Sequence, residues 1–119
     1  MTDEEFVIPK KLIPALKDVV HDLVVGNFAK LEADGRAGRL TASELRQVLE
    51  DYGRTFIDLP DEAFEVGGGA VPLANEEETW GVDLDLWTAE EGQSDLTLTM
   101  TVRNTDKGIV IEIDDLHAL

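Results

Sequence analysis

The stretch Trp80–Asp115, WGVDLDLWTAEEGQSDLTLTMTVRNTDKGIVIEIDD, decides the fold of this 119-residue chain. Apolar and polar residues alternate over three of its segments, 80–87, 95–103 and 109–114. A period of two is typical of a strand with one face on a core and the other in water. We therefore predict three antiparallel strands, joined by a long loop at 89–94 and a short one at 104–107. After residue 114 the alternation slips, which we interpret as a bend.

Helical signals precede this stretch. Apolar residues recur at helical spacing from Leu12 to Val24, and Gly26 is a stop signal; Asp18 and Asp22 fall on the polar side of this helix. Asn27 is a candidate cap for a short second helix. Thr41 and Glu44 have the spacing of a capping box, which predicts a third helix ending at Gly53.

These signals predict an α+β fold, with two or three N-terminal helices packed on one face of a C-terminal antiparallel meander of three to four strands. We expect a single domain over 1–119, with a loose tail at 1–8, a helical half at 9–55, a connection at 56–79 and the sheet at 80–119. The connection contains one helical turn at 61–64 and three glycines that are compatible with a short edge strand. Those glycines lack the Gly-Lys-Ser/Thr ending of a phosphate loop.

The negative charge is concentrated in the second half of the chain. The net charge is −16, and residues 56–119 carry sixteen acidic side chains against two basic ones. Such a surface repels nucleic acid and anionic membranes and attracts basic partners. The alternative is that the acidic side chains only keep a small protein soluble. The chain has no cysteine, no apolar run long enough to span a membrane and an acidic N-terminus unlike a secretory signal. We therefore expect a cytoplasmic protein.

Candidate binding residues lie on the polar face of the predicted sheet. Matching the apolar faces pairs Leu86 with Leu96 and Val102 with Ile109. This register predicts two rows across the three strands, each with a threonine between two acids. One tryptophan and two acids at the end of the face complete the set of candidate residues. The first row is Asp83, Thr99 and Glu112, the second is Asp85, Thr97 and Asp114, and the remaining three are Trp87, Glu90 and Glu91.

The spacing of these rows argues against metal binding, and the lack of a cleft on an open sheet face argues against glycosidase-like catalysis, which the spacing alone would allow. The acids of one row would stand roughly 10 Å apart, two strand spacings, which is too far for one metal ion. We predict no catalytic residue, no metal and no cofactor. Trp87 is either an exposed hot spot for protein binding or a ring covered by another segment, and both alternatives stay open. His21 is expected to be structural or exposed, and the run Asp114-Asp115-Leu116-His117 is only a weak signal for a metal.

Three segments resemble a family of small bacterial proteins of uncharacterised function. They are EDYGRT at 50–55, DLWTAEEGQSDLTL at 85–98 and IDDLH at 113–117. This resemblance implies no activity. The order of helices before a curved antiparallel sheet is also similar to cystatin-like and nuclear-transport-factor-like folds, a likeness of topology that carries no function.

Two hypotheses of function follow. The first is a non-enzymatic acidic binding protein, such as an immunity-like or inhibitory protein that masks a basic partner. The second is a small-molecule-binding protein or enzyme with a pocket between the helices and a curved sheet, lined by Trp80, Met100 and Tyr52. We favour the first, and we expect no nucleic acid or membrane partner and a monomer or weak homodimer.

Overall fold

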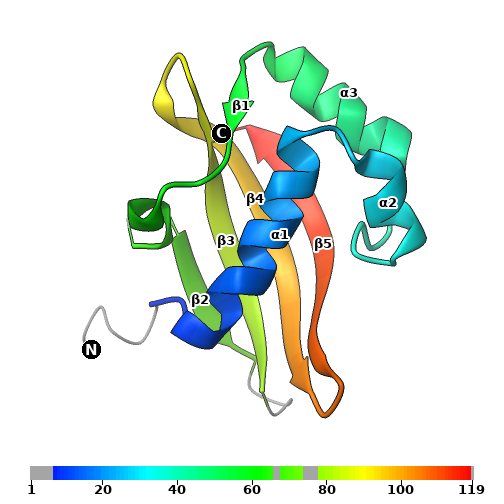
Figure 1. The fold of residues 1–119 in the computed structure, drawn as a ribbon, viewed down its shortest axis with the longest axis vertical. Coiled ribbons are helices and arrows are strands. Elements are labelled where there is room, and N and C mark those ends of the chain that lie inside the picture. The colour runs from blue at the N-terminus through cyan, green and yellow to red at the C-terminus, as the bar shows by residue number, and fades with distance from the viewer. Residues whose placement is uncertain (1–6, 66–67, 74–77, 119) are drawn as a thin grey trace.

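A computed structural model describes residues 7–65, 68–73 and 78–118 (Figure 1). Of the predicted loose tail at 1–8, residues 1–6 lie outside the described residues. Three α-helices come first and an antiparallel sheet follows, which confirms the α+β class. In chain order the elements are η2 (Lys10–Leu12), α1 (Ile13–Val24), α2 (Phe28–Ala33), α3 (Ala42–Tyr52), β1 (Phe56–Ile57), η3 (Asp61–Phe64), β2 (Gly68–Pro72), β3 (Thr79–Thr88), β4 (Gly92–Thr105) and β5 (Gly108–Ala118).

The predicted helices form, with two differences of detail. The capping box of α3 is present: the Glu44 amide donates to the Thr41 hydroxyl at 3.1 Å, and the Thr41 amide donates to the Glu44 carboxylate at 3.0 Å. Asn27 stands at the N-cap of α2, but its side chain makes no capping bond. Ile8, which we assigned to the loose tail, is buried in the core.

The sheet has five antiparallel strands, in the order β1-β3-β4-β5, with β2 also paired to β3. The two short strands β1 and β2 come from the predicted connection and share one edge of β3. The glycine run serves packing here. A Cβ at Gly68 would approach the Ala63 carbonyl oxygen and the Leu84 side chain to 2.9 Å, so only glycine lets β2 lie this close.

Irregularities in β4 and β5 explain two wrong expectations. The loop between β3 and β4 spans only 89–91, because β4 begins at Gly92 and then contains a bulge. The Ser94 hydroxyl bridges this break, donating to the Leu86 carbonyl at 2.6 Å and accepting from the Leu96 amide at 3.1 Å. In β5 the slip after residue 114 is no bend: Asp114 is a bulge residue, and the strand continues to Ala118.

One hydrophobic core lies between the helices and the inner face of the sheet. Figure 1 shows α1 crossing that face, with α2 and α3 near β5. The inward side chains of β3, β4 and β5 are buried there, as are four from α1: Leu16, Val19, Val20 and Leu23. Apart from Thr79 at the start of β3, the side chains that alternate to the opposite side along β3, β4 and β5 are exposed or half-buried, so this side of the sheet is the free surface of the molecule.

Candidate functional site

The open face of the sheet is the outward side of β3, β4 and β5. Its polar residues are held in an ordered pattern on rigid strands. The Thr99 hydroxyl donates to the Asp83 carboxylate at 2.9 Å, and the Thr97 hydroxyl donates to the Asp85 carboxylate at the same distance. Gln93 donates to the second oxygen of Asp85 at 2.7 Å. The pairing of Asp83 with Thr99 and of Asp85 with Thr97 is therefore confirmed.

The predicted pairing of the third strand is wrong by two residues. Val102 lies opposite Ile111, not Ile109, because the hairpin closes tightly on the pair Thr105 and Gly108. A shift by two residues leaves every side chain on the same face, so the apolar pattern could not distinguish the two registers. The bulge at Asp114 adds one more residue to the shift beyond Ile113, so the actual rows are Asp83–Thr99–Asp115 and Asp85–Thr97–His117.

The two candidate acids of β5 therefore have other neighbours. Glu112 lies opposite Thr101, and its carboxylate stands 3.5 Å from the Arg103 guanidinium. The bulge residue Asp114 accepts a hydrogen bond of 2.7 Å from the Thr101 hydroxyl. Both acids remain exposed on the open face, so β5 still adds to its negative charge.

Sequence reasoning omitted Asp115 and His117 from this face. Their side chains form a pair, with Asp115 Oδ2 2.9 Å from His117 Nδ1. The sequence did contain a signal for this. Two consecutive acids, Asp114 and Asp115, interrupt the alternation, and two polar residues in a row within a strand are typical of a bulge; both are exposed.

Glu90 and Glu91 serve the fold more than the free surface. The Thr55 amide and hydroxyl both donate to Glu90 at 2.8 Å, and these bonds, the amide first, hold the pKa of Glu90 below its ordinary value. Glu91 accepts from the Tyr52 hydroxyl at 3.0 Å and from the Thr88 hydroxyl at 3.0 Å. The two acids thus fasten the β3–β4 turn to the chain that follows α3.

Trp87 ends the open face as a half-buried residue. Its ring lies near Gly92, where an added Cβ would come within 3.7 Å of it, and Ile57 and Gln93 are its cross-strand neighbours. The indole Nε1 is buried and has no hydrogen-bond partner among the described residues. The ring is thus neither fully exposed nor fully covered.

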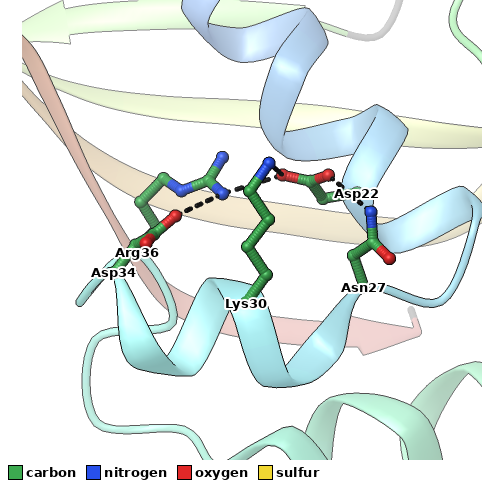
Figure 2. Close-up of polar contacts among 5 residues, drawn as sticks. All are labelled: Asp22, Asn27, Lys30, Asp34 and Arg36. Carbon is green, nitrogen blue, oxygen red and sulfur yellow. Dashed lines mark hydrogen bonds and ion pairs between the residues drawn. The ribbon is translucent and has the colours of Figure 1, made fainter.

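A polar cluster around the buried Asp22 joins α1 to α2 and to the loop that follows α2 (Figure 2). The sequence pattern did not predict this cluster. We placed Asp22 on the solvent side of α1, but it is 5% exposed. Its carboxylate accepts from the Arg36 guanidinium at 2.8 Å and from the Asn27 amide at 3.1 Å, with Lys30 at 3.9 Å. Arg36 also donates to Asp34 at 2.8 Å.

The pKa of Asp22 records this environment. Burial raises it, but the hydrogen bonds from Asn27 and Arg36 and the positive charges of Arg36 and Lys30 outweigh burial. The pKa therefore lies below its ordinary value of 3.8, and the side chain is ionised in the folded protein at neutral pH.

The residues suggested for an internal pocket are not gathered around one cavity. Met100 is fully buried in the core, Tyr52 bonds Glu91, and Trp80 lies 5.1 Å below the Lys11 ammonium. A hollow of about 480 Å³ lies instead between α1, the loop after α2 and the start of β5. We call it the edge groove.

Two further observations concern the described part of the chain. It contains no group of three or more His, Asp or Glu side chains arranged to hold a metal ion. Nor is any described helix both long and apolar enough to cross a membrane.

Comparison with known proteins identifies a family but no characterised relative. No curated protein matches the chain, and no solved structure does either. Residues 20–119 match a family described as a domain of unknown function (DUF7668). This match includes α2, α3, the five strands and the predicted binding residues, which all fall between Asp83 and Asp114. Because it covers most of the chain, the protein belongs to this family of uncharacterised domains.

Proposed function

We propose that this is a non-enzymatic binding protein whose open face docks a basic protein, in the manner of an immunity-like or inhibitory protein. The observation that carries the proposal is the fixed orientation of Asp83 and Asp85, each held by a threonine of β4 on an uncovered sheet. A carboxylate has about four acceptor positions, so these bonds leave others free for lysine or arginine. Ordering the side chains in advance lowers the entropy lost on binding.

The surrounding charge supports the same partner class. Asp83, Asp85, Glu112, Asp114 and Asp115 share the open face, where Arg103 is the basic residue of β4. Residues 56–119 carry a net charge of −14. A field of one sign over one face accelerates association with an oppositely charged protein and disfavours partners of like charge.

Neither carboxyl group with a shifted pKa is suited to act as a general acid. The pKa values of Asp22 and Glu90 are both lowered, by hydrogen bonds that serve the fold. A general acid needs the opposite, a carboxyl whose pKa is raised toward the working pH.

The proposal is tested by capture from cells of the source organism with matched charge reversals. The double variant Asp83→Lys/Asp85→Lys alters the open face, and Glu62→Lys/Asp106→Lys alters two exposed acids elsewhere by the same total charge. We expect the wild type and the control to recover the same basic protein and the face variant to lose it. Recovery of no basic protein, or equal recovery by both variants, contradicts the proposal.

A further inference from the structure

The outer edge of β5 is partly unoccupied. β5 is the last strand of the sheet, and backbone N–H groups along such a strand point alternately to either side. Ile113 donates its N–H away from β4, to the Arg36 carbonyl at 2.8 Å. The regular pairing from 109 to 113 therefore directs the N–H groups of Ile109 and Ile111 to the same outer edge. Among the described residues no backbone group accepts from these two amides there.

The chain itself already uses the upper part of this edge. The loop from Arg36 to Gly38 lies against Ile113, and a Cβ at Gly38 would collide with the Ile113 carbonyl oxygen. Asp22 holds this loop through Arg36 (Figure 2). The edge thus accepts a backbone segment at 113 and stays open below it, where Figure 1 shows β5 running down to its turn with β4.

The edge groove borders the open part. Its floor is apolar and comes from α1 and β5, and its rim is charged. The floor residues are Ala15, Val19, Ile109 and Ile111, and the rim residues are Asp18, Asp34, Arg36 and Glu112. A strand added to β5 would direct alternate side chains into this groove, because residues of one strand alternate between the faces of a sheet.

The open part of the edge, residues 109–112, also lacks the usual protection against strand addition, since the bulge of β5 lies further along the strand, at Asp114. Residues 109–111 are Ile-Val-Ile, with neither proline nor lysine, and Val110 is 45% exposed. Edge strands that avoid pairing normally carry such residues or a bulge.

The charge of the rim selects the occupant. Arg36 is neutralised by Asp22 and Asp34 at 2.8 Å each. Asp18, by contrast, has no hydrogen-bond or ion-pair partner among the described residues. The rim therefore presents net negative charge. A second copy of the chain would bring more acidic side chains to this edge. Because like charges that face each other across strands are destabilising, the rim disfavours a second copy as the occupant.

We propose that residues 109–112 of β5 take up an extended segment of a partner protein in which apolar residues alternate with lysine or arginine. The segment adds a strand to the sheet, its apolar side chains enter the edge groove, and its basic side chains, which alternate to the other face of the sheet, meet Glu112 there. This site lies at the edge of the sheet, and it does not depend on binding at Asp83 and Asp85.

The probe is a capped peptide of alternating lysine and valine, seven residues long, with every second amide N-methylated so that it cannot pair with itself. Backbone hydrogen exchange is followed by NMR on the whole chain. At saturating peptide we expect exchange at Ile109 and Ile111 to slow by about tenfold or more, since both amides gain acceptors. Val110 and Glu112, already paired to β4, should change little. Absence of binding, or binding without protection of Ile109 and Ile111, overturns the proposal.

Matched variants locate the site. Val110→Lys should weaken peptide binding about tenfold, a loss of roughly 1.4 kcal/mol. Val71→Lys replaces a comparably exposed valine (49%) on β2 and should leave affinity within about twofold. Equal effects of Val110→Lys and Val71→Lys contradict the proposal.

Further measurements test whether another occupant, or the open face, accounts for the binding. A peptide with glutamate in place of lysine should not bind, and equal binding of both peptides contradicts the charge argument. A wild-type dimer in light scattering that Val110→Lys converts to a monomer would assign the edge to a second copy and overturn the proposal. Asp83→Lys/Asp85→Lys should retain the protection of Ile109 and Ile111, which distinguishes this site from the open face.

Discussion

At the scale of single residues, Asp22 is the side chain whose role differs most from expectation. It lies on α1 beside the apolar stripe, and helical spacing alone placed it in water. Its burial depends on Arg36, which arrives from a loop beyond α2. A single charge taken from water is stabilised only by partners that compensate its lost hydration, and here Arg36 and Asn27 supply them.

Removing the Asp22 carboxylate should destabilise the protein. Asp22→Ala leaves Arg36, which is 20% exposed at its side chain, without its buried partner. We expect the free energy of unfolding to fall by about 2–3 kcal/mol. Asp18→Ala, on the same helix but exposed and unpaired, should change it by less than about 0.5 kcal/mol. Urea denaturation measures both, and equal losses would contradict the assigned role of Asp22.

The lowered pKa of Asp22 gives this stabilisation a pH dependence. A carboxyl with a lower pKa in the folded state stabilises the protein fully above its unfolded pKa, about 3.8, and loses this contribution as pH falls through the folded value. The stability difference between the wild type and Asp22→Asn should therefore be constant from neutral pH down to about 5 and shrink at lower pH. A difference that grows on acidification would be inconsistent with a lowered pKa.

At the scale of elements, the sequence predicted those features that depend on residues close together in the chain. The capping box of α3 and the alternation in β3 and β4 depend on neighbouring residues, and both were confirmed. The register of β5 depends on a turn closed at Thr105 and Gly108, and a shift by two residues preserves the apolar pattern. The short strands β1 and β2 exist only through pairing with β3, so their own sequences gave little indication.

The loop that covers part of the β5 edge gives a prediction at this scale. Gly35 and Gly38 both have positive φ, +80° and +63°, but only at Gly38 would a Cβ collide with the backbone of Ile113. Gly35→Ala should cost about 1–2 kcal/mol from the left-handed conformation alone. We expect Gly38→Ala to cost more than Gly35→Ala, measured by chemical denaturation. The reverse order would show that the loop does not pack on β5 as described.

At the scale of the whole molecule, the acid divides between two uses. Glu90 and Glu91 fasten a turn, and Asp22 and Asp34 hold Arg36, so these acids are occupied within the fold. On the open face, Asp83, Asp85 and Asp114 are instead ordered by threonine hydroxyl groups and remain exposed or partly accessible to solvent. Charge counts from the sequence could indicate an acidic half, but they could not separate these groups, because the partners come from distant parts of the chain.

The central claim is that the open face, and not acidity in general, recognises a basic protein. The most direct measurement is calorimetric titration of the basic protein recovered by capture against the wild type and the two double variants. We expect Asp83→Lys/Asp85→Lys to weaken binding by about a hundredfold, near 2.7 kcal/mol, and Glu62→Lys/Asp106→Lys to weaken it by about threefold at most. Equal weakening by the two variants would contradict the claim.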